Sequence, residues 1–304
     1  MSTPFDIGSL APDAFREVLP SFLAAYVDEP EASAANLERV RTLVSGWSDE
    51  TTRGVMERLA CMEPGAGVLE AHPACRELER VWAVDVVKEP TLDGVGELRA
   101  AMEAGPTVLL GNHLSYFDAS ALDCALAWSG HGDVADRIVA AAGPKVYEVM
   151  FRRIAAACIN TLPVPQTTRL AHTKQMSGRE LARQALASLK GAKEAAAVGQ
   201  VLLLYPEGSR TRTGHLGSFV RGVHRYLAIA DEVAVVPCSI TGTERIMPLG
   251  ATRLTPGTVH VRFGSPLRVG PDGDSKVVLE QAFHAVASLL PEAFRPLAET
   301  PPLA

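Results

Sequence analysis

Three short runs of the chain are apolar at nearly every position: TVLLG at 107–111, VLLLY at 201–205 and VAVVPCS at 233–239. A strand with one face in water alternates apolar and polar residues, whereas a strand covered on both faces is apolar throughout. Stretches with apolar residues at helical spacing separate these runs along the chain. The pattern therefore predicts an α/β fold, with a mixed, mostly parallel sheet covered by helices on both faces.

The remaining patterns divide the chain into two regions. Strands are also expected at 137–141, 159–164 and 258–263, and helices near 91–104, 117–129, 145–157, 177–198, 218–230 and 275–290. Four helical patterns precede them, at 12–27, 31–45, 48–60 and 73–82, and Ser48 before Asp49 and Glu50 has the pattern of an N-cap. We expect a small helical N-terminal region at 1–88 and an α/β domain at 89–304.

Charge is distributed unevenly along the chain. The formal net charge is −6, yet residues 145–225 contain thirteen Lys and Arg against four Glu and no Asp. Such asymmetry suggests that part of this region faces an anionic ligand; ordinary solvated helix faces are the alternative, and they are favoured for 179–193. Nucleic acid is not the expected partner, because the whole chain is acidic, only 6% of residues are aromatic, and no recognition motif is present.

The first apolar run leads directly into Asn112 and His113, and Asp118 follows five residues later. The carboxyl end of a strand is where open α/β sheets place their ligand sites. A carboxylate that orients an imidazole, while the imidazole removes a proton from a hydroxyl, is a Ser-His-Asp triad without its serine. His113 and Asp118 are the candidate catalytic pair. Ser115 as a covalent nucleophile and a purely structural histidine are the alternatives.

A second polar cluster follows the run at 201–205 and contains Glu207, Gly208, Ser209, Arg210 and Arg212. Glycine permits close backbone approach, and planar guanidinium groups suit phosphate oxygens. Phosphate binding is the predicted role. The alternatives are a surface loop with solvated arginines and an ion pair between one of them and Glu207.

The ordered combination of these motifs resembles a known family. His-x4-Asp after a strand, Pro-Glu-Gly-Ser-Arg about ninety residues later and an apolar strand ending in Pro237 are similar to the glycerolipid acyltransferases, which include the glycerol-3-phosphate and 1-acylglycerol-3-phosphate acyltransferases. The resemblance covers about 105–250. It implies that His113 is the general base, that Asp118 is its partner, and that Glu207 to Arg210 line the site of the acceptor phosphate. Arg212 joins this site by proximity.

The resemblance extends to two further segments. FVRG at 219–222 is similar to a Phe-Lys-x-Gly stretch of the family, and Pro237 is expected in the wall of the acyl channel. The arginine that usually follows Pro-Val in the family is missing after Val164, so Arg169, His172 and Lys174 are candidates for the missing positive charge. In this departure and in its N-terminal helices, the chain is more similar to the soluble glycerol-3-phosphate acyltransferases than to the membrane-bound lysophosphatidate enzymes.

The implied reaction moves a fatty acyl group from an acyl-CoA or acyl carrier protein thioester to a hydroxyl of a phosphate-bearing acceptor such as glycerol-3-phosphate. No metal or redox cofactor is expected. Four alternatives stay open: a 1-acylglycerol-3-phosphate acceptor, a non-glycerol acceptor, a thioester hydrolase, and a noncatalytic protein that binds an acyl carrier or a lipid phosphate.

Compartment is inferred from two features of the chain. No window approaches 18 apolar residues and the first residues lack a basic start before an apolar run, so a cytoplasmic protein is expected. The basic, apolar segment at 145–157 either rests on an anionic bilayer, as peripheral membrane contact, or packs on the sheet. Five scattered cysteines are expected to be buried free thiols.

Overall fold

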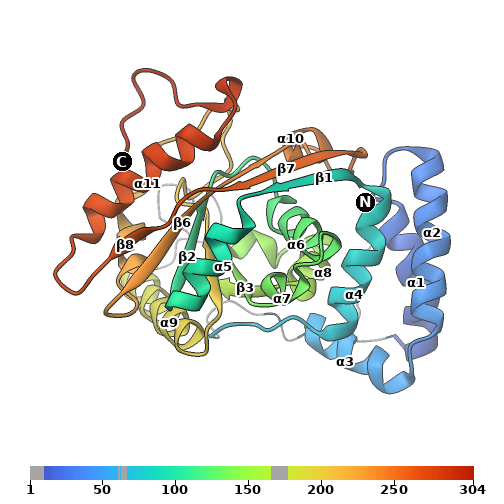
Figure 1. The fold of residues 1–304 in the computed structure, drawn as a ribbon. Coiled ribbons are helices and arrows are strands. Elements are labelled where there is room, and N and C mark those ends of the chain that lie inside the picture. The colour runs from blue at the N-terminus through green and yellow to red at the C-terminus, as the bar shows by residue number, and fades with distance from the viewer. Residues whose placement is uncertain (1–9, 61, 63–66, 166–176) are drawn as a thin grey trace.

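A single eight-stranded sheet forms the centre of the molecule (Figure 1), and the computed structural model describes residues 10–60, 62, 67–165 and 177–304. Seven strands follow the spatial order β1-β7-β6-β2-β5-β3-β4, and β8 pairs with the remaining part of β6. The strands are β1 (Val87–Asp93), β2 (Thr107–Gly111), β3 (Ile138–Ala142), β4 (Asn160–Pro163), β5 (Val201–Leu204), β6 (Val233–Thr241), β7 (Gly257–Phe263) and β8 (Leu267–Val269).

Most strand pairs are parallel, and only the pairs of β6 with β7 and with β8 are antiparallel. Successive residues of β2 contribute to different cores, because Leu109 lies on one face of the sheet while Val108 and Leu110 lie on the other. This explains why the run has no polar positions. The predicted fold class, a mixed and mostly parallel sheet covered on both faces, is confirmed.

Helices cover the two faces of the sheet separately. One face packs against α5, α6 and α8, and the opposite face packs against α9, α11 and the 3-10 helix η4. The helices are α1 (Pro12–Ala24), α2 (Pro30–Ser45), α3 (Asp49–Ala60), α4 (Pro73–Trp82), α5 (Val95–Ala104), α6 (Asp118–Trp128), α7 (Gly132–Ala135), α8 (Met150–Cys158), α9 (Gly178–Ala197), α10 (Thr243–Ile246) and α11 (Ser275–Leu289). Short 3-10 helices are η2 (Ala83–Asp85), η3 (Pro144–Val146), η4 (Arg221–Leu227) and η5 (Glu292–Phe294).

Local chemistry accounts for several helix starts. Three helices begin with proline, which needs no hydrogen-bond acceptor at the first helical position: α1, α2 and α4. The Ser48 hydroxyl accepts a hydrogen bond from the Thr51 amide at 3.1 Å, which confirms the expected cap of α3. Ser177 caps α9 in the same way, accepting from the Glu180 amide at 3.2 Å.

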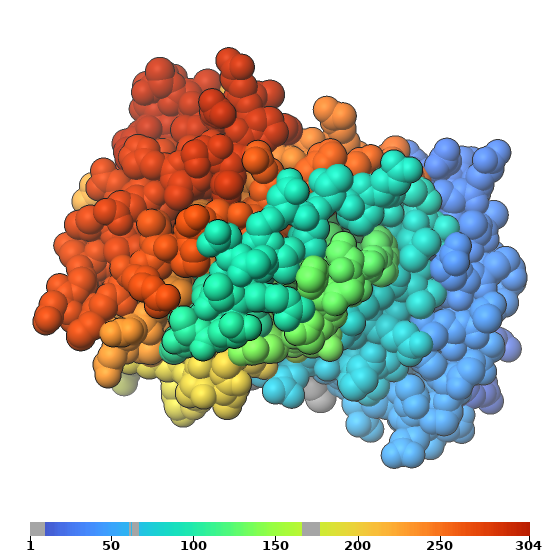
Figure 2. Space-filling view, in the orientation of Figure 1, coloured from blue at the N-terminus to red at the C-terminus, as the bar shows by residue number. Residues whose placement is uncertain are grey.

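The N-terminal helices lie directly against one side of the sheet region, with the C-terminal helix α11 at the opposite side (Figures 1 and 2). Their apolar side chains share one core with α6 and α8. Trp82 of α4 contacts the rings of Phe117 and Phe151 edge-on, with centroids 6.2 and 5.7 Å apart. The helical layer thus supports the start of α6, while the division of the chain at residue 88 stays a prediction.

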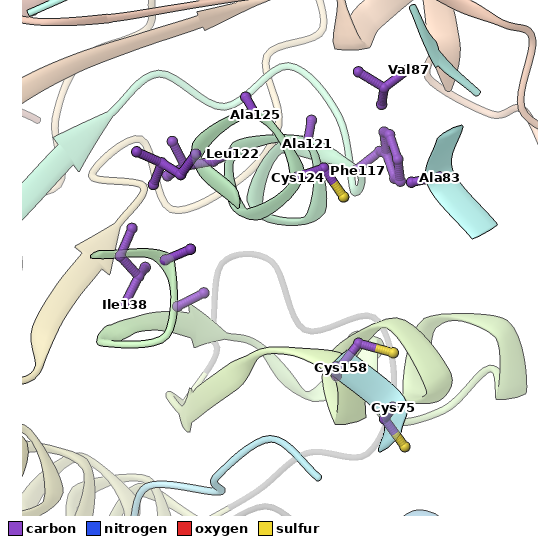
Figure 3. Close-up of a cluster of buried hydrophobic side chains, with 14 of the residues drawn as sticks. Cys75, Ala83, Val87, Phe117, Ala121, Leu122, Cys124, Ala125, Ile138 and Cys158 are labelled. Atoms are coloured by element: carbon purple, nitrogen blue, oxygen red, sulfur yellow. The ribbon is translucent and has the colours of Figure 1, made fainter. Parts of the chain in front are cut away.

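Helix α6 is buried on all sides, and Figure 3 shows Ala121, Leu122, Cys124 and Ala125 pointing from it into surrounding side chains. Of the five cysteines, the four within the described residues are buried free thiols, as expected: Cys75, Cys124, Cys158 and Cys238. Cys61 lies outside the described residues. The enclosure of α6 gives its first residue, Asp118, a rigid base.

The expected helix near 91–104 was wrong in its first residues, which belong to strand β1. Pro90 lies inside β1, and the register with β7 is interrupted between Lys88 and Thr91, where Glu89 has a positive φ of 44°. Prolines occur in sheets at edge strands and bulges, and β1 is the edge strand of this sheet. A bulged, charged edge strand lacks the apolar run that identifies the central strands.

Two other assignments need correction. Segment 218–230 forms the 3-10 helix η4 instead of an α-helix, and the three-residue strand β8 was missed because it is too short to show a pattern. The basic segment at 145–157 forms η3 and α8, and α8 buries Phe151 and Ile154 against the rest of the protein. Its apolar stripe therefore packs in the core.

A buried carboxyl group joins α4 to α6 and gives a testable pH dependence. Glu79 is 5% exposed, and burial, reinforced by the nearby Asp123 carboxylate, raises the pKa of Glu79 to about 8 against the opposing effects of Ser120, Arg76 and Arg80. The folded state then holds this proton more tightly than the unfolded chain does. Stability from this group is present at low pH and is lost as pH rises towards 8.

We therefore expect the free energy of unfolding of the wild type to fall, relative to Glu79→Gln, by up to about 1.4 kcal/mol per pH unit between about pH 5 and pH 8. Denaturant unfolding of both proteins across this range measures the difference. Parallel pH profiles for the two proteins would show that Glu79 ionises normally in the folded state.

Candidate active site

His113 lies immediately beyond strand β2, and its ring is held by Asp118 at the first position of α6. Asp118 Oδ2 accepts a hydrogen bond from His113 Nδ1 at 2.8 Å. The same carboxylate accepts from the amides of Leu114 and Ser115, at 2.9 and 3.1 Å, and from the Thr243 hydroxyl. Asp118 is fully buried. Because the carboxylate can only accept, Nδ1 carries a proton and Nε2 is free to accept one.

Tyr205 packs against one face of the imidazole. The rings of His113 and Tyr205 stack, with centroids 4.2 Å apart and planes inclined by 17°. Burial, and secondarily the charge of Asp118, raises the pKa of the Tyr205 hydroxyl well above its usual range, and this hydroxyl has no partner among the described residues. The ring therefore acts as a wall for the imidazole, a contact that the sequence analysis missed.

Glu207 is held by two backbone amides, a contact that its motif did not reveal. Its Oε1 accepts from the His113 amide at 2.8 Å, and its Oε2 accepts from the Gly217 amide at 2.9 Å. Burial raises the pKa of Glu207 to about 7, against the effect of these two amides. The Thr211 amide also donates to the His113 carbonyl at 2.9 Å. Glu207 thus ties the His113 turn to the loop after β5, and forms no ion pair within the part of the chain that is described.

The loop after β5 contains the other predicted residues. Gly208 has a φ of +70°, in the left-handed region, and a Cβ there would lie 3.1 Å from a Val220 methyl group, so the turn favours glycine. The Arg210 guanidinium lies over the Tyr116 ring, 3.7 Å from its centroid. Ser209 and Arg212 are exposed. No carboxylate of the described segments pairs with either arginine.

These residues share one cavity of about 1170 Å³ with His113: Glu207, Gly208, Ser209, Arg210 and Arg212. Asp118 lies behind His113, outside the lining. Five basic side chains line the cavity against a single carboxylate, that of Glu207, among described residues: Lys145, Arg152, Arg210, Arg212 and Arg225. This excess of positive side chains in the lining suits an anionic group.

The remaining lining is mostly apolar, formed by small or aliphatic side chains such as Ala140, Ala142, Ala155, Ala156, Ile159 and Leu189. Some of these residues belong to the core on one face of the sheet, whereas others, such as Leu204 and Leu216, belong to the core on the opposite face. The cavity therefore extends over the carboxyl edge of the strands. It combines a cationic part with room for hydrocarbon.

Three other predicted residues lie outside the described part of the chain: Arg169, His172 and Lys174. Pro237, expected in the wall of the acyl channel, is not among the described residues that line the cavity; it lies within β6, where it pairs with Leu110. Ser115 is fully buried and its hydroxyl donates to the Met247 carbonyl at 3.0 Å. Because that proton is donated to a backbone carbonyl and not to the imidazole, Ser115 is not placed as a nucleophile.

Two wider features of the described residues bear on the site. Within residues 10–60, 62, 67–165 and 177–304, no group of three or more His, Cys, Asp or Glu side chains is arranged to hold a metal ion. No helix in that part of the chain has the length and apolar character needed to cross a membrane.

Comparison with known proteins gives a family model whose match includes His113, Asp118 and the loop after β5. Residues 94–241 match the family model described as Acyltransferase. A 1-acyl-sn-glycerol-3-phosphate acyltransferase of Cocos nucifera is 29% identical over 99 residues, 32% of this chain and 32% of that protein. A chloroplastic 1-acyl-sn-glycerol-3-phosphate acyltransferase of Arabidopsis thaliana is 39% identical over 80 residues, 26% of this chain and 22% of that protein. The matched segments thus span about a third or less of those plant proteins.

Among solved structures, the 1-acyl-sn-glycerophosphate acyltransferase PlsC of Thermotoga maritima matches with a TM-score of 0.46 and 16% sequence identity, over 90% of this chain and 97% of that chain.

Proposed function

We propose that this protein, whose residues 94–241 match the Acyltransferase family model, is a glycerolipid acyltransferase that transfers a fatty acyl group from a thioester to a hydroxyl of a glycerol phosphate lipid. The observation that carries the proposal is the His113–Asp118 pair, which borders a cavity that is cationic in one part and apolar in another. A phosphate-bearing, acylated substrate needs both kinds of lining.

The pair supplies a general base for the acceptor. The Asp118 carboxylate keeps the proton on Nδ1, so Nε2 removes the proton of the attacking hydroxyl as that oxygen bonds to the thioester carbonyl. The resulting imidazolium is stabilised by Asp118 and can return its proton to the departing thiolate. Holding the hydroxyl against Nε2 makes the attack effectively intramolecular.

The negative oxygen that develops in this reaction needs donors other than the turn that follows His113. The amides of Leu114 and Ser115 donate to Asp118, and the Phe117 amide donates to the Ser115 hydroxyl at 3.2 Å. We therefore assign the stabilisation of the oxyanion to groups of the loop after β5, which contacts the His113 turn through the Thr211 amide and Glu207.

The acceptor that we favour is a 1-acylglycerol-3-phosphate. A cavity of about 1170 Å³ exceeds the range of about 300 to 1,000 Å³ that is usual for small-molecule sites. Glycerol-3-phosphate would leave the apolar lining to a single acyl chain from the donor, whereas an acylated acceptor uses the lining on both faces of the sheet. The names of the plant relatives agree with this choice. Glycerol-3-phosphate, the acceptor expected from the sequence, is the second candidate.

The donor is proposed to be an acyl-CoA or an acyl carrier protein thioester. The basic lining suits the phosphates of coenzyme A, and it equally suits the phosphate of the carrier's prosthetic arm. Neither a metal nor a redox cofactor has a step in the proposed reaction.

Two competing functions use the same residues differently. A thioester hydrolase would activate water with His113, but water gives no role to the cationic lining beside the imidazole. A noncatalytic binding protein would have no use for a carboxylate that fixes the imidazole tautomer. Both therefore explain less of the site than acyl transfer does.

Release of free thiol separates these functions. We expect thiol release from a long-chain acyl-CoA or acyl carrier protein thioester to require 1-acylglycerol-3-phosphate, and to proceed less well with glycerol-3-phosphate. Thiol release at the same rate with and without either acceptor would identify a hydrolase. Tight binding of a donor without release, with either acceptor present, would identify a binding protein.

Arginine replacement tests the acceptor side of the proposal. We expect Arg210→Ala or Arg212→Ala to raise the KM for the acceptor by about tenfold or more, because a charge-assisted hydrogen bond to phosphate is lost, while the KM for the donor changes little. Initial rates with each substrate varied in turn give both values. Equal effects on the two substrates would count against an acceptor-phosphate site.

A further inference from the structure

Tyr116 brings together two arginines from distant parts of the chain. This half-buried ring lies in the turn between His113 and Asp118. The guanidinium carbon of Arg210 lies 3.7 Å from the ring centroid, and that of Arg152, on α8, lies 4.7 Å from the same centroid. Both guanidinium groups therefore contact one ring, and both line the same cavity.

The two cations lack a counter-charge within the described part of the protein. Neither Arg152 nor Arg210 forms an ion pair with a described carboxylate, although both line the cavity that contains His113. The nearest acidic lining group, Glu207, directs its oxygens at the amides of His113 and Gly217. Like charges in one cavity repel each other, and a bound anion would offset the repulsion that the contacts with Tyr116 leave.

We propose that Arg152 and Arg210, both stacked on Tyr116, form a two-guanidinium site for a phosphate monoester, and that Arg152 thereby selects dianionic monoesters over singly charged diesters. This inference rests on the proposed function and names the part of the site that recognises its acceptor. Guanidinium groups bind phosphate oxygens through forked hydrogen bonds, and a monoester carries a charge of about −1.5 to −2 at pH 7.

The position of Arg152 makes it suitable for this role. It lies on α8 beside Ala155 and Ala156, which line the apolar part of the same cavity. A ligand with its phosphate at Arg152 can therefore extend a hydrocarbon chain along the same helix. Arg152 also supplies, within the described residues, the positive charge that the sequence analysis assigned to Arg169, His172 or Lys174.

Tyr116 is a positioning residue in this arrangement. Stacking on an aromatic face holds a guanidinium in one plane, so that its fork points in a fixed direction. A lysine has no planar fork and does not stack in this way. The geometry therefore predicts that Arg152→Lys is a partial replacement only.

The test compares Arg152→Gln, Arg152→Lys and Tyr116→Leu with wild type. Arg268→Gln, an exposed arginine on β8 outside the cavity lining, is the matched control for loss of one charge. Initial rates give the KM of the acceptor and of the donor separately, with 1-acylglycerol-3-phosphate and a glycerophosphodiester as alternative acceptors. Calorimetric titration of the same monoester in the absence of donor gives its affinity without turnover. Thermal unfolding of each variant confirms that it is folded.

We expect Arg152→Gln to weaken binding of the monoester, and to raise its KM, by about tenfold to a hundredfold while the donor KM stays within about twofold. For Arg152→Lys and Tyr116→Leu, the Kd and KM for the monoester should lie between those of the wild type and those of Arg152→Gln. The preference for monoester over diester should be smaller in all three variants than in the wild type. If Arg152→Gln binds the monoester as Arg268→Gln does, the inference is overturned. If the wild type binds the monoester through Arg152 but transfers no acyl group, the proposed function fails while the site stands.

Discussion

His113→Ala is expected to lower the acceptor-dependent rate of acyl transfer by about 10² to 10⁴, the usual cost of losing a general base. Nε2 of His113 is the only nitrogen of this ring left free by Asp118, and the ring lines the cavity. The variant should bind acceptor and donor nearly as the wild type does, because the arginines of the lining remain. Steady-state kcat measured at saturation with both substrates gives the comparison.

A second histidine provides the matched control. His215 lines the same cavity, but its Nδ1 pairs with the Arg295 backbone carbonyl at 2.9 Å instead of a carboxylate. His215→Ala should therefore keep kcat within about tenfold of the wild type. A His113→Ala protein that is folded and retains most of its rate would remove the imidazole from the mechanism.

Asp118→Asn should also lower kcat by about 10² to 10⁴, for a different reason. The carboxylate accepts from His113 Nδ1, from two backbone amides and from Thr243, and an asparagine must turn an N–H group towards one of these donors. The imidazole then loses its tautomer and the charge that stabilises imidazolium. We expect the acceptor KM to change much less than kcat, since Asp118 is fully buried behind the ring.

Thr243→Val gives the graded comparison, because it removes one donor from Asp118 and leaves the carboxylate in place. Its kcat should stay within about tenfold of the wild type. Thermal unfolding of both variants separates loss of stability from loss of chemistry. Equal kcat values for folded Asp118→Asn and wild type would mean that the carboxylate only supports the turn.

The central strands could be predicted from the sequence because each is buried on both faces, so β2, β5 and β6 are apolar runs. Strand β1 was not predicted, because it is an edge strand with Pro90, a bulge and polar residues, and so it has no apolar run. The order of strands along the sheet could not be predicted either, since it depends on long-range packing that local sequence patterns do not show.

The contact between His113 and Asp118 was predictable because the two residues are five apart and follow a strand. The residues that surround these two side chains were not predictable. Thr243 lies 125 residues from Asp118 along the chain, and Arg152 and Arg210 meet only through the ring of Tyr116. The hydrogen bonds of Glu207 were not predictable either, because a sequence shows that a carboxylate is present but not that two backbone amides occupy its oxygens.

The most direct test of acyl transfer by the His113–Asp118 pair is a count of ester formed per thiol released. Wild type and His113→Ala are mixed with a radiolabelled acyl thioester and 1-acylglycerol-3-phosphate, and the labelled lipid and the free thiol are measured in the same samples. The proposed function predicts one ester for each thiol in the wild type, and initial rates of formation of both products that are lower by about 10² or more in the variant. Thiol without ester in the wild type, or an equal yield of ester in the variant, would contradict it.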